Sequence, residues 1–148
     1  MKHWFKILAI FNLGLILNCG DVPTCIPTES NLVKIAFLDD EGKSKPLTFT
    51  LRALDREDLF LDYTDTTLSK LVLPLNGSSN TTTFVIDHDA ISDTLGLSYD
   101  VVAQLISPEC GLEIALSELD TTSTTFENLR ILENIIHEDV NTNIEITL

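Results

Sequence analysis

The feature that most constrains the fold is a strict alternation of apolar and polar side chains over residues 47–53. The apolar positions of this segment are Leu47, Phe49, Leu51 and Ala53, and the positions between them are polar. Successive side chains of a β-strand point to opposite faces, so this pattern predicts a strand with one face packed and the other in water. In residues 33–37 the large apolar Val33, Ile35 and Phe37 alternate with Lys34 and the small Ala36, which predicts a second strand.

The rest of the chain continues in short apolar segments between polar turns. Further strands are expected at residues 59–63, 71–75, 81–87, 97–106, 112–116, 129–135 and 144–148. Residues 39–45 and 76–80 are expected to be turns, and residues 87–95 to hold a helical turn. Eight or nine strands of this length predict an all-β fold, an antiparallel β-sandwich of immunoglobulin-like type, built as one domain from residues 31–148.

The N-terminal segment has the pattern of a secretory signal. Lys2 and Lys6 precede an apolar run over residues 7–17, which is shorter than the roughly 20 residues that a transmembrane helix needs. Ile16-Leu17-Asn18-Cys19 then fits a lipobox, and residues 1–18 are expected to be removed so that Cys19 becomes a lipid-carrying first residue. The alternative is an ordinary signal peptide followed by a coincidental cysteine. Residues 19–30, with Pro23 and Pro27, are expected to form a tether.

The remaining two cysteines are expected to form a disulfide. With Cys19 lipidated, Cys25 and Cys110 are left in an exported, oxidising compartment, where two cysteines allow only one pairing. The alternatives are a free buried thiol at Cys110 or redox chemistry, and no Cys-x-x-Cys spacing supports the latter.

The charge of the chain excludes some partners. It carries 9 basic and 23 acidic residues, for a net charge of −14, and removal of the signal takes away two of the basic residues and no acidic residue. Such a surface repels nucleic acid, so no nucleic-acid partner is expected. A solvated surface that keeps the domain soluble is the simplest interpretation.

The sequence contains few residues in patterns suited to metal binding or catalysis. Asp87, Asp89 and Asp93 surround His88 and are candidate ligands for a hard cation such as Ca²⁺, although a capped helix start or a solvated turn explains them as well. His137-Glu138-Asp139 is a similar, weaker cluster. No motif for nucleophilic catalysis or phosphate binding is present, so neither a catalytic residue nor a cofactor is expected.

Three threonines match a sequon for protein O-glycosylation. Thr66, Thr94 and Thr121 each follow an aspartate and precede Thr or Leu, and all three are expected to lie in turns. About one such match would arise by chance in a chain this rich in Asp and Thr.

The order of several short segments resembles an uncharacterised family of Bacteroidota lipoproteins known only as a domain of unknown function. The segments are Leu73-Pro74-Leu75-Asn76, Asn80-Thr81-Thr82-Thr83-Phe84, Asp93-Thr94-Leu95, Leu97-Ser98-Tyr99, Ser107-Pro108-Glu109-Cys110-Gly111-Leu112 and Asn141-Thr142-Asn143-Ile144-Glu145-Ile146. The resemblance implies a β-rich envelope domain and strengthens the pairing of Cys25 with Cys110. It supplies neither an activity nor site residues.

The sequence therefore predicts a protein of the cell envelope, held by the lipid on Cys19 to a membrane, with the outer membrane favoured. The expected function is a non-enzymatic module that binds an envelope protein partner or supports an assembly. The alternative is a carbohydrate-binding or adhesive module, which would need two or three exposed aromatic side chains on one face.

Overall fold

The computed structural model describes Cys25, residues 31–54 and residues 63–148. Within these residues the chain forms nine strands: β1 (Leu32–Leu38), β2 (Leu47–Ala53), β3 (Thr66–Leu68), β4 (Lys70–Pro74), β5 (Thr81–His88), β6 (Ile91–Ser107), β7 (Gly111–Thr124), β8 (Asn128–Ile131) and β9 (Ile144–Thr147). No helix in this part of the chain is long and apolar enough to cross a membrane.

The strands form two sheets, of four strands in the order β4-β1-β9-β8 and of five strands in the order β3-β2-β5-β6-β7. All ladders are antiparallel except that between β1 and β9, in which Ile35 lies opposite Ile144. The prediction of an all-β sandwich of eight or nine strands is thus confirmed, with one parallel pair that the sequence pattern did not indicate.

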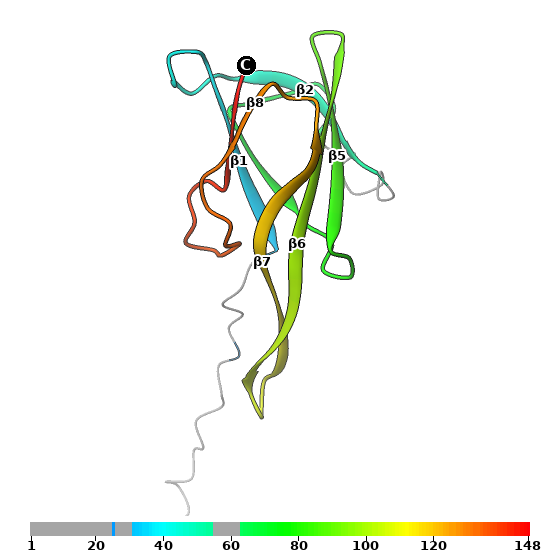
Figure 1. Ribbon diagram of the computed structural model, residues 1–148, viewed down its shortest axis with the longest axis vertical. Coiled ribbons are helices and arrows are strands. Elements are labelled where there is room, and N and C mark those ends of the chain that lie inside the picture. Colours follow the sequence, from blue (N-terminus) through cyan, green and yellow to red (C-terminus); the bar gives the residue numbers. More distant parts are fainter. Residues whose placement is uncertain (1–24, 26–30, 55–62) are drawn as a thin grey trace, which may run out of the picture.

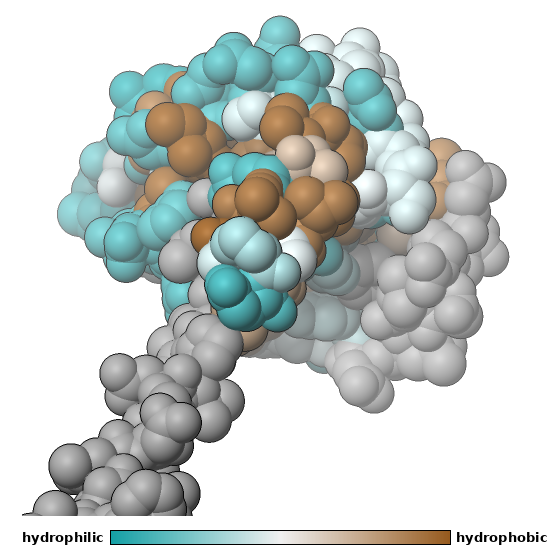
Figure 2. Space-filling model, turned by 90° about the horizontal axis from the view of Figure 1, so that it is seen from below, coloured by the Kyte–Doolittle hydropathy of each residue, from teal (hydrophilic) through white to brown (hydrophobic). Residues whose placement is uncertain are grey.

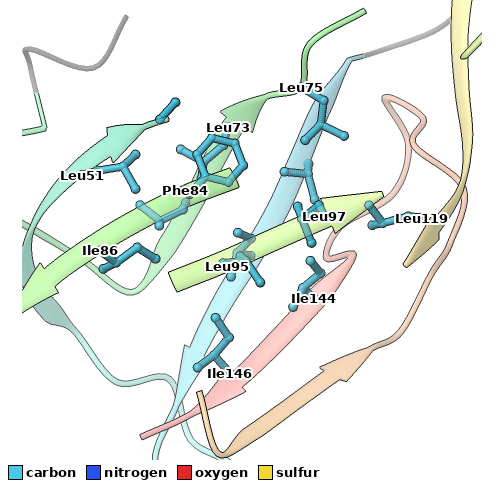
Figure 3. Close-up of a cluster of buried hydrophobic side chains, with 14 of the residues drawn as sticks. Leu51, Leu73, Leu75, Phe84, Ile86, Leu95, Leu97, Leu119, Ile144 and Ile146 are labelled. Atoms are coloured by element: carbon cyan, nitrogen blue, oxygen red, sulfur yellow. The ribbon is translucent and has the colours of Figure 1, made fainter. Parts of the chain in front are cut away.

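The core lies between the two sheets, where their apolar faces meet (Figure 3). The alternation in β2 places Leu47, Phe49, Leu51 and Ala53 in this core, as expected, and leaves Arg52 exposed. The largest fully buried side chains are Phe37, Phe49, Phe84, Ile35, Leu71, Leu73, Ile86, Leu95, Leu97, Leu116, Ile136 and Ile144. Burial of apolar area at about 25 cal/mol per Å² makes this contact the main source of stability.

The polar side chain of Asn143 is buried together with this core, and the residue is 1% exposed. Its Oδ1 accepts a hydrogen bond of 3.0 Å from the Lys34 backbone N–H, and its Nδ2 donates one of 2.8 Å to the Ile135 carbonyl. The Asn143 amide thereby joins β1 to the long connection between β8 and β9. Because the side chain has partners for both its ends, its burial carries no unsatisfied group.

The expected helical turn at residues 87–95 is wrong. His88 pairs with Ile91 across a two-residue turn, and β5 and β6 continue as a hairpin from there. Both turn residues have positive φ, 45° at Asp89 and 62° at Ala90, as a tight hairpin turn of this handedness requires. Asn-Gly is the usual signal for such a turn, and its absence here is why the sequence pattern did not reveal the hairpin.

Several predicted strand bounds also differ from the structure. Strand β7 extends to Thr124, beyond the expected end at residue 116, while β8 ends at Ile131 instead of residue 135. The short edge strand β3 was not expected, and the predicted strand at residues 59–63 lies outside the described residues except for Tyr63. The turns at residues 39–45 and 76–80 are confirmed as connections between strands.

Strands β6 and β7 are much longer than the others and project as a hairpin beyond the body of the sandwich (Figure 1). We call the projecting part, residues 101–116, the arm. The turn between β5 and β6 lies at the opposite end of β6 (Figure 1). The register of the β6–β7 ladder shifts at three places, one of them next to Gly96, where an added Cβ would stand 2.6 Å from the Ser123 Oγ. Such irregularities increase the local twist of a hairpin.

Candidate functional site

The predicted disulfide between Cys25 and Cys110 is present, with 5.5 Å between the two Cα atoms. Cys110 lies in the turn of the arm, where β6 ends at Ser107 and β7 begins at Gly111. The disulfide therefore fastens the N-terminal segment to the tip of the arm. The alternative of a free thiol at Cys110 is wrong.

One face of the arm is a ladder of apolar pairs. Val101 lies opposite Leu116, Ala103 opposite Ile114, and Leu105 opposite Leu112. Residues directly opposite each other in an antiparallel pair share a face, so all six side chains project to the same side. At the base of the ladder Leu116 is in the core, which shows that this face continues the core-facing side of the sheet.

The apolar ladder becomes exposed toward the tip. The exposed fraction rises from 1% at Leu116 to 46% at Ile114 and 70% at Leu112, and Leu105 is 62% exposed. The other face of the arm also exposes Val102 and Ile106. Viewed from the end where the arm projects, apolar surface gathers around the arm (Figure 2). Exposed apolar side chains grouped in this way are typical of interaction surfaces.

A polar cluster lies at the opposite end of β6, beside the turn between β5 and β6. His88 Nε2 lies 2.8 Å from Asp93 Oδ2, and the other oxygen of Asp93 accepts a hydrogen bond of 2.6 Å from the Thr125 hydroxyl. The His88 ring stacks on Phe126 at a centroid distance of 6.5 Å, and its side chain is only 8% exposed. Its Nδ1 atom is buried without a hydrogen-bond partner.

This cluster does not have the order of a catalytic triad. In a triad the imidazole lies between the nucleophile and the carboxylate, so that it can remove the proton of the nucleophile. Here the Asp93 carboxylate lies between His88 and Thr125 instead. The arrangement can hold the imidazole in one orientation against Phe126, and the Thr125 hydroxyl donates to the Asp93 carboxylate.

The acidic side chains proposed as cation ligands have other partners. Asp87 accepts hydrogen bonds from Ser92 Oγ at 2.5 Å and Arg52 Nε at 3.2 Å, which hold the pKa of its carboxyl below the ordinary value. Asp93 is bound by His88 and Thr125, and the Asp89 side chain is 83% exposed at the turn. In residues 31–54 and 63–148, no three His, Cys, Asp or Glu side chains form a group that could hold a metal ion.

His137 is likewise held locally. Its Nδ1 accepts a hydrogen bond of 3.2 Å from the Asp139 backbone N–H, and the Asp139 carboxylate is 94% exposed. The hydrogen bond from Asp139 to the imidazole thus closes a local turn.

The region that carries the arm is also the region that a family model recognises. The model described as a family of unknown function (DUF6452) matches residues 48–148, which include Cys110 and all strands from β3 onward. The chain belongs to this family. No curated protein and no solved structure matches the chain. The DUF6452 match begins after Cys25, so one half of the disulfide lies within the matched region and the other half precedes it.

The three threonines of the glycosylation sequons lie in the DUF6452 region but not where they were expected. Thr66 begins the edge strand β3, whereas Thr94 lies within β6 and Thr121 within β7. The expectation that Thr94 and Thr121 lie in turns is therefore wrong. The Thr94 backbone N–H also donates a hydrogen bond to Thr125.

The lipidation predicted at Cys19 falls outside the residues that the structure describes. The expectation of exposed aromatic side chains, in contrast, concerns described residues. The aromatic side chains within them are buried or partly buried, namely Phe37, Phe49, Tyr63, Phe84, Tyr99 and Phe126. The described residues therefore do not present the group of exposed aromatic side chains that a carbohydrate-binding surface would need.

Sequence reasoning missed the arm as a candidate site. The signal was available, because Val101, Val102, Leu105 and Ile106 make both faces of β6 apolar near the turn. A strand that is apolar on both faces is usually covered on both faces. The arm departs from that rule because it extends beyond the opposing sheet.

Proposed function

We propose that the protein is an envelope lipoprotein, anchored by a lipid on Cys19, and that its sandwich is a non-enzymatic binding or assembly module. The observation that carries the proposal is the disulfide between Cys25 and Cys110. Structural disulfides persist in oxidising compartments outside the cytoplasm, which is where a lipobox cysteine is modified. The disulfide and the signal pattern thus support the same compartment by independent arguments.

The lipid attachment follows from the residues around Cys19. The aliphatic Ile16 three positions earlier and the apolar run over residues 7–17 suit a lipoprotein signal. A thioether to diacylglycerol at Cys19, followed by acylation of the new amine, would supply the two or more chains that stable anchoring needs. Gly20 after the cysteine, and the Bacteroidota lipoproteins that the chain resembles, favour the outer membrane.

A binding role is supported by the free edge of the five-stranded sheet. In the described residues the outer side of β7 makes a bridge between Leu116 and Ile136 and a hydrogen bond from Leu119 to Asn134, and residues 120–124 remain at the edge. An exposed sheet edge offers backbone groups to which a partner strand can pair. The acidic surface favours a partner with basic side chains around such a strand.

Substitution of Cys19 tests the anchor. Cys19→Ser should abolish metabolic labelling with an alkyne-tagged fatty acid and should release the protein from sedimented membranes. The double variant Cys25→Ser/Cys110→Ser is the matched control, because it removes the other two cysteines and should keep the label. Labelling that persists in Cys19→Ser would contradict the anchor at this residue.

Affinity isolation tests the binding role. The lipidated wild type, solubilised from its native membranes in mild detergent, should carry an envelope protein in a fixed ratio. Recovery of the lipoprotein alone, after crosslinking in intact cells, would contradict a role in assembly.

A further inference from the structure

The exposed apolar tip of the arm lies next to the residue through which the domain is tied to its N-terminal segment. We propose that this tip rests in the interfacial layer of the bilayer that holds the lipid on Cys19. The inference relies on the anchor proposed above and assigns a second, non-covalent contact with lipid to the arm.

The chain length between the anchor and the arm limits their separation. Cys19 stands six positions before Cys25, and six residues span at most about 22 Å even when fully extended. The disulfide then brings Cys110 to within 5.5 Å of Cys25, measured between Cα atoms. The tip of the arm is therefore held close to the lipid whatever path the intervening residues take.

The short distance from Cys19 to Cys25 also decides which end of the sandwich lies near the membrane, and that end is the arm. Strand β6 is 17 residues long, from the turn at its start to the tip of the arm. At 3.2–3.4 Å per residue its two ends are on the order of 50 Å apart, so the far end lies beyond the reach of the short segment from Cys19 to Cys25. A domain held by Cys110 thus presents its arm to the membrane and its other end to the aqueous phase.

The side chains around Cys110 suit the boundary between head groups and acyl chains. Leu105 and Leu112 face each other as a pair two to five residues from Cys110, and they are 62% and 70% exposed. Ile106 adds a third exposed apolar side chain on the other face. Apolar residues of peripheral proteins are buried about 5–10 Å into this layer, where they leave water.

The charges and the backbone of the arm restrict the kind of lipid and the depth. No lysine or arginine occurs in residues 100–117, and Glu109 is exposed at the tip. Without basic residues the arm gains nothing from anionic head groups, so it should prefer a zwitterionic bilayer. The β6–β7 ladder satisfies the backbone groups on the inner side of the hairpin, while the open edge of β7 keeps the insertion shallow.

Tryptophan fluorescence tests the contact directly. The single Trp of the chain, Trp4, lies in the predicted signal, so an introduced Trp is the only one in the processed protein. Leu112→Trp reports on the arm, and Ile91→Trp, also at an exposed position but at the other end of β6, is the matched control. Both lipidated proteins are reconstituted into phosphatidylcholine vesicles with or without brominated acyl chains, and flotation measures anchoring separately.

The arm contact predicts that both proteins float, that Leu112→Trp emits at shorter wavelength than Ile91→Trp, and that brominated lipid quenches Leu112→Trp alone. Equal emission and equal quenching at the two positions would overturn the arm contact while the flotation still supported the anchor. Shorter-wavelength emission without quenching would also overturn it, because a second copy of the chain would then cover the arm. Proteins that do not float would refute the anchor and, with it, this inference.

Discussion

Cys25 and Cys110 are 85 residues apart in the sequence and are joined by a disulfide at the tip of the arm. The family match covers Cys110, in the arm, and begins after Cys25. The disulfide is therefore a second covalent link, besides the backbone that leads into β1, between the sandwich and the segment that follows Cys19. It determines which end of the domain is nearest to the proposed anchor.

Removal of this disulfide should destabilise the protein. A bond that closes a loop of this length restricts the unfolded chain, and its loss should lower the free energy of unfolding by about 2–4 kcal/mol. Urea unfolding of Cys25→Ser, Cys110→Ser and the double variant measures the effect. The double variant should lose no more than either single variant, because each substitution removes the same bond. Additive losses would contradict the account.

Replacement of Ala90 by glycine should stabilise the turn between β5 and β6. Ala90 has a φ of 62°, a conformation that costs a residue with a Cβ roughly 1–2 kcal/mol and costs glycine nothing. After the greater entropy of glycine in the unfolded chain is subtracted, Ala90→Gly should raise the free energy of unfolding by about 0.5–1 kcal/mol.

Ala103→Gly is the matched control for that turn. Ala103 lies within β6 and is absent from the positions with positive φ, so glycine there should lower stability by about 0.5–1 kcal/mol. If both variants shifted the urea midpoint in the same direction, the strain at Ala90 would be refuted.

Strands with one wet face could be predicted from the sequence, as β2 shows. Leu51 and Arg52 differ in polarity because they point to opposite sides, so the pattern alone identifies the strand. The start of β6 could not be predicted in this way. Asp93 occupies a partly buried strand position only because His88, at the end of β5, and Thr125, just after β7, provide its hydrogen bonds.

Only the covalent part of the candidate site was predicted from the sequence. Once Cys19 is assigned to the lipid, the two remaining cysteines allow one pairing, and this argument led to the disulfide. The exposure of Leu112 could not be predicted, since a strand residue is buried or exposed according to whether the opposing sheet extends over it. That extent is a property of the tertiary structure, so the apolar residues on both faces of β6 mark the segment but do not show that it is left uncovered.

The buried amide of Asn143 should be essential for stability. Asn143→Ala leaves the Lys34 N–H and the Ile135 carbonyl without their partners in a partly buried region, which should cost about 1–3 kcal/mol. The control is Asn141→Ala, at an exposed position, which should change stability by less than about 0.5 kcal/mol. Thermal or urea unfolding measures both, and equal effects of the two variants would argue against this role.

The stabilisation provided by the ion pair between Arg52 and Asp87 should be lost at acidic pH. The hydrogen bonds from Ser92 and Arg52 lower the pKa of this carboxyl in the folded state, so the pair stabilises the fold above the unfolded pKa near 4 and the effect is lost as pH falls through the folded pKa. The pair is exposed, so Asp87→Asn should cost only about 0.2–1 kcal/mol at neutral pH.

The pH dependence distinguishes this ion pair from a general effect of charge. The difference between wild type and Asp87→Asn should shrink as the pH of the urea titration is lowered below about 4. Asp100→Asn, at an exposed position in β6, provides a baseline. A difference that stays constant, or grows, on acidification would be incompatible with a lowered pKa at Asp87.

The mass of the N-terminal peptide tests the central claim most directly. After reduction and tryptic digestion of the protein from native membranes, the first peptide should begin at Cys19, end at Lys34 and carry diacylglycerol. The intact mass, measured on the same preparation, also shows whether glycans occupy Thr66, Thr94 or Thr121. A peptide that begins at another residue, or that has an unmodified Cys19, would contradict the anchor and the position it gives to the arm.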